Sequence, residues 1–407
     1  RGEVKDLGLI TINESKAKDF ILKNQGLIDA VAKSVSGLVR DANGNLDVYS
    51  ADNLEKILSY KGHLGISNQD NLTSIDELQY YRNVTGITLD RNKNLAGKLD
   101  FSKYPQLVGN IIVQNSPLVT SIDVTGLDKI TAFSATNMKN MTDVTIKGNS
   151  KLQTVSLHHN ESLQAVDVRD LPELRLVETY YSKSVTTIKT AGSPKLTSIN
   201  ATSSGSLSSI PGLNENTQLV DFVAPYTPLE SLDFSNQPNL RSVNLLSAKV
   251  KELKGLAASG TNLKNLQLSN TQLSSLDVSN NTELLELELY NSKITKLDVT
   301  ANKKLKRLRI PFNPLEELVL GDNTALEYLD ISHDRLSTLD ITKLTALKKV
   351  YAGRQTQKAN PGILQSMTVY YTAAQKTVLD PVIAGSKDPS KVNYAETNAD
   401  ATYVVKN

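Results

Sequence analysis

The chain has no cysteine and no tryptophan, and aromatic side chains make up only 5% of its 407 residues. Without cysteine it can form no disulfide, no thiolate metal site and no cysteine nucleophile. With so few aromatic side chains, any core must be built mainly from Leu, Ile and Val. The composition therefore suits a thin, layered interior.

An excess of one charge sign is also missing, because 45 Lys and Arg stand against 43 Asp and Glu. No global field attracts nucleic acid or an anionic membrane, and neither is predicted as a partner. No apolar run is long enough to cross a bilayer. The first residues, RGEVKDLGLI, lack a signal-peptide pattern, which is typical of a trimmed mature protein. An export or lipid-anchoring segment before Arg1 stays open.

Catalytic motifs are scarce as well. The sequence contains no HExxH, no nucleophile elbow and no phosphate-cradling glycine loop, and it has only four histidines. We therefore expect no catalytic residue, no resident metal and no cofactor, and we predict that the chain is not an enzyme.

What the sequence does contain is a repeat. Aliphatic anchors recur at alternating steps of ten and eleven residues, which gives a period of 21, and each anchor opens the phrase LxxLxL. This phrase at periods of about 20 to 29 is typical of leucine-rich repeats. The regular anchors are Leu263, Leu273, Leu284, Ile294, Leu305, Leu315, Leu326, Leu336 and Leu347. Looser spacing extends the array upstream, so that it runs from about Val84 to Tyr351.

Strand periodicity is present within each phrase, because its fourth and sixth residues lie two apart and face one side. A single unit can bury that face only by stacking on its neighbours, which predicts a solenoid with atypical ends. A polar residue follows many phrases, and its side chain can satisfy backbone groups where the chain turns. Such residues are Asn160, Thr271, Ser292, Asn313 and Asp334.

The two half-repeats differ at their outward middle position. One set repeats aspartate, at Asp233, Asp277, Asp298 and Asp340. The other set varies through Ser156, Glu178, Asn200, Val223, Asn244, Gln267, Glu288, Arg309 and Asp330. An outward position that keeps the same residue indicates a structural role, and an outward position that varies from repeat to repeat indicates a binding face. We therefore assign the varied set to a concave parallel sheet and the aspartate set to the opposite, convex wall.

These phrases resemble the repeats of bacterial surface proteins of the internalin type, and of the secreted or lipid-anchored versions common in Bacteroidetes. LTSIDELQYYRNVTGITLDRN is similar to the entry into the first repeat of that family, and KKVYAGRQTQ followed by MTVYYTAAQKTVL is similar to its closing cap. The chain departs from relatives that stack a ladder of cysteines, because aliphatic and small residues take that place. The resemblance implies an α/β fold, a curved right-handed leucine-rich-repeat solenoid with a parallel concave β-sheet, a helical N-terminal cap and a strand-plus-helix C-terminal cap.

The domain organisation follows from these patterns. We expect an N-terminal helical cap at 1–71, the repeat array at 72–353 and a C-terminal cap at 354–407. In the C-terminal cap the sequence predicts a strand over 366–371 and a helix from Thr372 to about Ile383, whose end Pro381 obscures. A short strand from Ala401 to Val405 closes the chain.

Two regions of the N-terminal cap have helical patterns. Apolar and charged residues alternate from Ser15 to about Ser36, which predicts two short helices separated at Gly26. A further helix is expected from Asp52 to Leu58, with Asp52 or Ser50 as its N-cap.

The segment DANGNLDVYSAD between these helices partly fits a calcium loop. Its oxygen-bearing residues fall at positions one, three, five, seven and twelve of the loop frame, and they are Asp41, Asn43, Asn45, Asp47 and Asp52. The sixth position, which needs glycine, is Leu46, and the twelfth is aspartate in place of a bidentate glutamate. A calcium site and an ordinary Asx-rich turn both stay open, and these departures favour the turn.

Aromatic and polar side chains gather at a first place on the varied face. They are His158, Glu178, Tyr180, Tyr181 and Tyr226. A His–Glu metal or acid–base site is conceivable there, but His158 and His159 point to different sides and no third ligand recurs. We interpret the group as an aromatic recognition patch, since tyrosine supplies a large contact area at low entropic cost. A plain solvent-exposed ladder is the alternative.

A second gathering lies toward the C-terminal end of the array. It comprises Tyr290, Arg307, Arg309, Phe312, Tyr328, His333 and Tyr351, with Asp330 beside them. We predict that these seven residues lie on the concave face and bind the partner. The basic run KKLKRLRI would indicate a nucleic acid or sulfated glycan only if its charges were not neutralised. Nearby acidic residues such as Glu286 and Glu288 instead predict cross-strand ion pairs.

Taken together, the patterns predict non-enzymatic binding of a protein partner along the concave face. The protein would be an adhesin or scaffold that is secreted or held at the cell surface, where a lipid anchor in the outer membrane is one option, and it would bind a host extracellular or cell-surface protein. The alternative is a glycan-binding module of a surface polysaccharide-handling system, because exposed aromatic rings serve as sugar platforms. An enzyme or an enzyme inhibitor is the third class, and it would require a closed pocket of titratable groups that the sequence does not predict.

Overall fold

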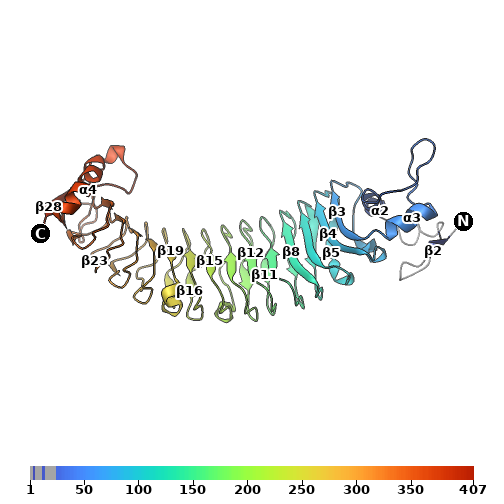
Figure 1. The fold of residues 1–407 in the computed structure, drawn as a ribbon, viewed down its shortest axis with the longest axis horizontal. Helices are drawn as coiled ribbons and strands as arrows, with labels where there is room; N and C mark the ends of the chain where they lie inside the picture. Colours follow the sequence, from blue (N-terminus) through green and yellow to red (C-terminus); the bar gives the residue numbers. More distant parts are fainter. Residues whose placement is uncertain (1–2, 5–11, 14–23) are drawn as a thin grey trace. The chain divides into compact units, whose positions relative to one another are not determined.

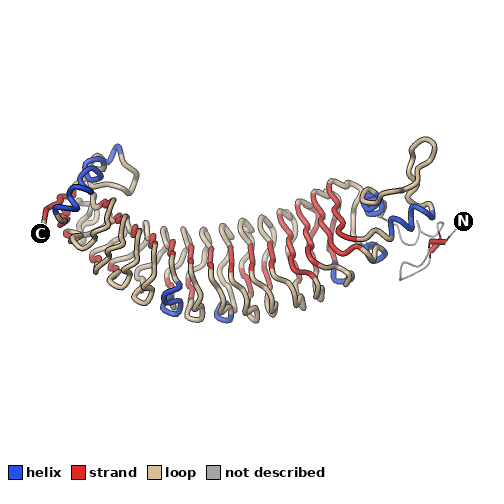
Figure 2. The backbone as a smooth tube through the Cα atoms, viewed as in Figure 1, coloured by secondary structure: helices blue, strands red, loops and turns tan. Residues whose placement is uncertain are grey.

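The computed structural model, drawn as a ribbon in Figure 1, describes residues 3–4, 12–13 and 24–407. The chain divides into two compact units. The first unit comprises Arg1–Leu196 and Ser203–Asn216, and the second comprises Thr197–Thr202 and Thr217–Asn407. Each unit is a stack of chain coils joined by turns, with short strands in both halves of most coils (Figure 2).

In the first unit, successive coils each contribute one strand to a parallel sheet, the main sheet of that unit. Its strands are β3 (Gly62–Ser67), β4 (Val84–Asp90), β6 (Gly109–Gln114), β8 (Ile130–Thr136), β10 (Thr154–Ser156) and β12 (Leu176–Glu178). The other halves of the coils form two smaller parallel sheets, β5 (Ala96–Asp100) with β7 (Leu118–Asp123) and β9 (Asp143–Thr145), and β11 (Ala165–Asp167) with β13 (Thr187–Lys189). Short 3-10 helices lie at Asp76–Tyr80, Phe101–Lys103 and Leu213–Glu215.

The second unit repeats this plan. Its main sheet contains β14 (Ser198–Asn200), β15 (Asp221–Val223), β17 (Ser242–Asn244), β19 (Asn265–Gln267), β20 (Glu286–Glu288), β22 (Arg307–Arg309), β24 (Tyr328–Asp330) and β26 (Lys349–Tyr351). The smaller parallel sheets are β16 (Ser231–Asp233) with β18 (Glu252–Lys254), β21 (Lys296–Asp298) with β23 (Glu317–Val319), and β25 (Thr338–Asp340) with β27 (Met367–Tyr371) and β28 (Ala401–Val405). Two 3-10 helices lie at Leu256–Asn262 and Pro389–Lys391.

The core is the predicted aliphatic spine. Leu266, Leu287 and Leu308 are aligned in parallel register on neighbouring main-sheet strands, and each is at most 1% exposed. Each such leucine contributes about 1.5–3 kcal/mol relative to an exposed one. The regular anchors from Leu263 to Leu347 are also buried, at no more than 3% exposure. Stacking of half-buried coils therefore gives the parallel solenoid that the repeat predicts.

The assignment of the two half-repeats to different sheets is confirmed. The varied half-repeats form the main sheet. The half-repeats with Asp233, Asp298 and Asp340 contribute strands to the smaller sheets, while the one with Asp277 forms no strand. The monotony of the aspartates has a structural cause. The Asp277 carboxylate accepts hydrogen bonds from Ser279 N at 2.9 Å and from Ser279 Oγ at 2.6 Å, and Asp298 is bound in the same way by Thr300. These bonds lower the pKa of both carboxyls and fix the turn that follows each aspartate.

The polar residues that follow the phrases are buried and hydrogen-bonded, as predicted. Asn313 Nδ2 donates to Leu289 O at 2.7 Å and to Ile310 O at 3.1 Å, while its Oδ1 accepts from Ile294 N at 3.1 Å. Thr271 Oγ1 donates to Leu268 O at 2.9 Å. These side chains join consecutive coils through backbone groups that would otherwise lack partners.

Two helices form the described part of the N-terminal cap. They are α2 (Gln25–Ala32) and α3 (Ala51–Leu58), and Ser50 caps α3 by accepting from Asn53 N. The helix predicted upstream of Gly26 lies outside the described residues. The predicted break at Gly26 is wrong, because this glycine lies inside α2. The domain boundaries at 72 and 353 stay predictions. Strand β3 precedes residue 72, yet it already pairs with β4 in the main sheet.

Gly26 is required for close packing of α2. A Cβ atom added there would lie 2.3 Å from the backbone of Asn71 and Leu72, nearer than real Cβ contacts allow. We therefore expect Gly26→Ala to push α2 away from this backbone and to cost about 1–3 kcal/mol, the usual range for overpacking. Thermal unfolding of the variant beside Gly65→Ala, which lies in strand β3 with nothing within 4 Å, measures this. Equal losses would contradict the packing role.

The C-terminal cap follows the prediction closely. Strand β27 leads into α4 (Ala373–Gly385), whose capping box joins Thr372 and Gln375, and the closing strand β28 pairs with β27. Gln375 Nε2 also donates to Ile341 O at 2.7 Å and Leu344 O at 3.0 Å, which docks the helix on the last coil. Pro381 lies inside the helix and does not end it. None of the helices in the described part of the chain has the length and apolar character to span a membrane.

Candidate recognition surfaces

The chain turns sharply after each main-sheet strand, and the residue at that corner has a positive φ. Most corners hold asparagine, serine or a charged residue, but five hold large rings: His159, Tyr181, Tyr226, Phe312 and His333, with φ between 56° and 59°. The left-handed conformation costs an ordinary L-residue roughly 1–2 kcal/mol, and asparagine tolerates it better. Aromatic rings at these corners therefore need another explanation than backbone preference.

The first aromatic cluster is His158, His159, Tyr180 and Tyr181, on two adjacent coils of the first unit. The His158 ring stacks on Tyr180 with centroids 4.2 Å apart and planes within 10°, and His159 lies 5.0 Å from Tyr181. Tyr181 is 55% exposed. The structure brings together three rings that the sequence placed in one patch, His158, Tyr180 and Tyr181, while Tyr226 lies in the second unit. It adds His159, and the expectation that His158 and His159 point to different sides is wrong, because their Nδ1 atoms lie 2.7 Å apart.

Charges around this cluster are modest. Burial and the neighbouring His159 lower the pKa of His158, and Glu178 opposes this shift. Glu178 is held by a hydrogen bond from Ser156 Oγ at 3.1 Å. The Nδ1 atoms of His158 and His159 lie 2.7 Å apart, so one proton between them suffices to form a hydrogen bond. The cluster offers flat rings and a few hydrogen-bonding atoms.

Tyr226 takes the same kind of corner in the second unit. Its φ is 58° and it is 54% exposed. Its backbone N–H donates to Leu246 O at 2.8 Å, which fixes the corner while the ring faces solvent.

Ion pairs connect the charged side chains of the second gathering, as predicted. Arg307 Nε donates to Glu288 Oε1 at 2.6 Å, and the Arg309 guanidinium lies 3.6 Å from Glu288 and 3.9 Å from Asp330. The Arg307 guanidinium also lies over the Tyr328 ring at 4.0 Å. Burial raises the pKa of Asp330 to about 6, against hydrogen bonds from Ser332 and the charge of Arg309 that lower it.

Part of this gathering is covered by the chain itself. The tail segment, residues 393–400, runs beside β24 and β26, where Tyr328 donates to Glu396 and Gly353 N donates to Thr397 O at 2.8 Å. Tyr328 and Tyr351 are consequently at most 9% exposed, so both serve in packing beneath the tail. Tyr290, Phe312 and His333 stay partly exposed.

The tail also adds rings and charges that sequence reasoning missed. Tyr394 stacks on Phe312 with centroids 4.4 Å apart, and Phe312 stacks on His333 at 4.0 Å. Glu396 binds both Tyr328 and Asn393. No periodic pattern marks the tail segment, and only the strand that follows it, β28, is indicated by the sequence.

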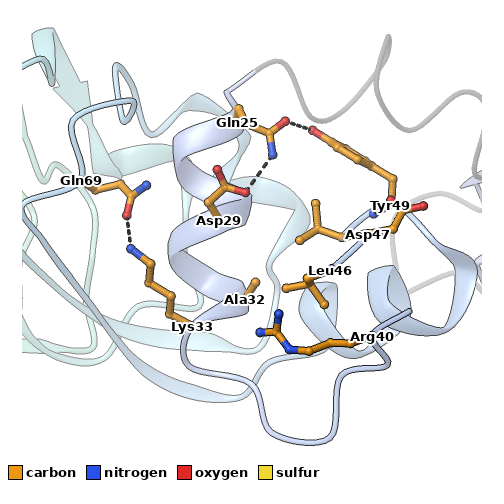
Figure 3. A pocket seen from close by; sticks show the side chains of 10 residues that line it. Gln25, Asp29, Ala32, Lys33, Arg40, Leu46, Asp47, Tyr49 and Gln69 are labelled. Carbon is orange, nitrogen blue, oxygen red and sulfur yellow. Dashed lines mark hydrogen bonds between the residues drawn. The ribbon is translucent and has the colours of Figure 1, made fainter. Parts of the chain in front are cut away.

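A separate cleft of about 530 Å³ lies in the N-terminal cap (Figure 3). Gln25 on α2 accepts from the Tyr49 hydroxyl and donates to Asp29 at 2.8 Å, and Lys33 donates to Gln69 at 2.9 Å. These contacts use most of the polar atoms that face it.

The neighbouring Asx-rich loop is built as turns. Asp41 Oδ1 accepts from Asn43 N and Asn45 N at 2.9 Å each, and Asp47 Oδ1 accepts from Tyr49 N at 3.0 Å. Across the described ranges, no group of three or more acidic, histidine or cysteine side chains is placed to hold a metal ion. These bonds are those of Asx turns.

Comparison with known proteins returns structures only. The sequence matches no protein-family model and no curated protein. Among solved structures, the functional domain of InlJ from Listeria monocytogenes is similar at 19% identity over 76% of this chain and 73% of that one, with a TM-score of 0.43. An internalin, InlF, from the same organism is similar at 15% identity over 82% and 95%, with a TM-score of 0.49. The leucine-rich repeat domain of APL1B is similar at 17% identity over 80% and 89%, with a TM-score of 0.48. The assignment of the fold as a leucine-rich-repeat solenoid rests on the sequence repeat of this chain and on the parallel register of its strands.

Proposed function

We propose that the protein is a binding solenoid without catalytic function that captures a protein partner on the main-sheet face, with the first aromatic cluster as the recognition centre. The observation that carries the proposal is Tyr181, a ring more than half exposed at a corner with φ 58°. On this proposal the sheet face is the concave one, and the secreted or cell-surface location rests on the resemblance in the sequence.

Stability alone does not favour this residue. Asn115 and Asn137 occupy the same corner in earlier coils, where Asn137 Nδ2 donates to Asn115 Oδ1 at 2.6 Å. Tyrosine at Tyr181 gives up such a bond and adds backbone strain. Its ring contacts with His159 and Tyr180 return about 0.5–1.5 kcal/mol each at most. The net contribution of the Tyr181 side chain to the free energy of folding is therefore near zero. A gain in binding is the simplest reason for an exposed ring at this position.

The cluster has the features of a protein-binding hot spot. Rigid rings immobilised by stacking lose little entropy when a partner binds, and tyrosine and histidine combine apolar area with hydrogen-bonding atoms. His158 and Tyr180 form the stacked base and His159 and Tyr181 form the exposed edge. Variation of the outward residues along the face supports partner-specific contacts on either side.

The substitution Tyr181→Asn tests this proposal. We expect the free energy of unfolding to change by less than about 1 kcal/mol, because lost ring contacts offset relieved strain. Binding to a protein selected by the wild type from an array of purified extracellular and cell-surface proteins should weaken at least about tenfold, as for a hot-spot residue. Surface plasmon resonance measures the affinities.

A matched control is Tyr370→Asn, on strand β27 of a smaller sheet. It removes a partly exposed tyrosine from the second unit, away from the main-sheet strands, and should leave the affinity unchanged. The proposal fails if no protein on the array binds the wild type, or if the Tyr181 variant binds as tightly as the Tyr370 variant.

A further inference from the structure

A second, smaller site lies in the second unit between the main sheet and the tail segment. This tail cleft has a volume of about 460 Å³, within the range of about 300–1,000 Å³ usual for small-ligand sites. Side chains of the sheet line one side, among them Gln267, Tyr290 and Arg309. Residues 393–396 line the other side, and the bonds from Tyr328 and Asn393 to Glu396 hold them in place.

An aromatic ring at the edge of the cleft has an open face. Tyr394 stacks on Phe312 within 7° of parallel, yet it remains 74% exposed. Phe312 in turn lies 5.4 Å from Tyr290, so the rings of the cleft are supported from behind. Exposure of a large ring in a fixed orientation provides a flat apolar platform at little further entropic cost.

The cleft also contains unused hydrogen-bonding groups. Within the described residues, the amide NH2 of Gln267 and the hydroxyl of Tyr394 make no hydrogen bond. The guanidinium of Arg309 makes none among these residues either, because the carboxylates paired with it lie 3.6 and 3.9 Å away. Asn393 uses its NH2 on Glu396 and keeps its Oδ1 as an acceptor. Donors and acceptors of this density suit a ligand with many hydroxyl groups, because each hydroxyl both donates and accepts.

Charge selects among such ligands. Arg309 is flanked by Glu288 and Asp330, and Glu396 lies across the cleft. The cleft therefore offers no net positive charge to a carboxylate or sulfate group.

We propose that the tail cleft binds an uncharged pyranose unit of a glycan. The apolar C–H face of the sugar stacks on Tyr394, its hydroxyl oxygens accept from Gln267 and Arg309, and a hydroxyl donates to Asn393. This site shares no residue with the first aromatic cluster. It therefore stands or falls separately from the protein-binding function proposed above.

The experiment uses the full chain and defined sugars. Saturation-transfer NMR and calorimetry are run with the methyl glycosides of glucose, galactose and mannose, with cellobiose, maltose and lactose, and with glucuronic and N-acetylneuraminic acids. We expect at least one uncharged sugar to bind and the two acids to bind more weakly. Absence of binding by every uncharged probe, or tighter binding of the acids, overturns the proposal.

Variants locate the site. Tyr394→Ala should weaken binding about tenfold, and Gln267→Ala by a similar factor, because either one removes an interaction worth about 1.4 kcal/mol. Tyr394→Phe retains the ring and should bind within about threefold of the wild type, the scale of a lost exposed hydrogen bond. Tyr181→Asn should leave sugar binding unchanged. If the tail serves only as a cap, the alanine variants shift the thermal unfolding temperature alone and sugar binding persists, which would contradict the proposal.

Discussion

Asparagine in place of Asp334 should stabilise the protein at pH 7 by about 3 kcal/mol, the order of the cost of a buried charge without a partner. Asp334 is fully buried, its Oδ1 accepts from Asn313 N at 2.8 Å, and its Oδ2 has no hydrogen-bond partner. Burial raises the pKa of this carboxyl well above its usual range. At pH 7 the folded protein must therefore either take up a proton or bury a charge, and asparagine avoids both.

The pH dependence of this gain has a definite sign. Because the folded pKa of Asp334 lies above the unfolded value of 3.8, its contribution to stability is fully present below about pH 4 and is lost as pH rises toward the folded pKa. The free-energy difference between Asp334→Asn and the wild type should therefore be smallest near pH 4 and grow with pH. Urea denaturation of both proteins from pH 4 to 8 measures it, and a difference independent of pH would contradict the prediction.

Two further variants bracket the result. The pKa of Asp330 is raised to about 6, so the gain from Asp330→Asn should grow between about pH 4 and pH 6, by roughly 3 kcal/mol at 1.36 kcal/mol per pKa unit, and then stop. Asp277→Asn should act in the opposite direction. Hydrogen bonds from Ser279 lower the pKa of Asp277, so its stabilising contribution is present above about pH 4 and is lost in acid.

The parts of the fold that the sequence predicts are those set by local periodicity. Leu287 and its counterparts recur at fixed spacing, and such a spacing admits one stack with one buried face. The C-terminal cap was equally predictable, because Thr372 and Gln375 form a capping box three residues apart and Ala401 begins a run of strand-forming residues. In each case the determining residues lie close together in the chain.

The corner positions carry a signal of their own in the sequence. Asn115, Asn137, Asn270 and Asn291 recur at one register position after the main-sheet strands, and asparagine is the non-glycine residue that best tolerates a positive φ. These asparagines mark the corner, and Tyr181 occupies the same register position. The sequence therefore indicates that Tyr181 is an exposed ring on a strained backbone.

The covering of the second gathering was not predictable from pattern. Tyr328 and Glu396 are 68 residues apart, and their hydrogen bond depends on where the chain returns after α4. Neither residue lies in a periodic relation to the other. The burial of Tyr328 and Tyr351, and the formation of the tail cleft, are tertiary effects that only the folded structure reveals.

Loss of the buried side chain of Asn160 should destabilise the first unit by about 3–5 kcal/mol. Asn160 Nδ2 donates to Ala135 O at 2.7 Å and its Oδ1 accepts from Met138 N at 2.9 Å, both in the preceding coil. In Asn160→Ala these two backbone groups lose their side-chain partner inside the stack, and each orphaned group costs roughly 1–3 kcal/mol, to which the cavity adds. Urea denaturation measures the loss, and hydrogen exchange should show faster exchange of the Met138 amide.

The comparison that decides the role of Asn160 is with Asn140 on the exposed side of a turn. Asn140 Nδ2 makes one hydrogen bond, to Pro117 O at 2.7 Å, and Asn140→Ala should cost less than about 1 kcal/mol because water replaces it. Asn160→Ser should fall between the two, since Ser182 fills the same slot in the next coil and its hydroxyl donates to Leu157 O at 2.7 Å. If the Asn160 and Asn140 alanine variants were equally stable, the coils would be joined by their aliphatic spine alone, and the polar column beside it would be dispensable.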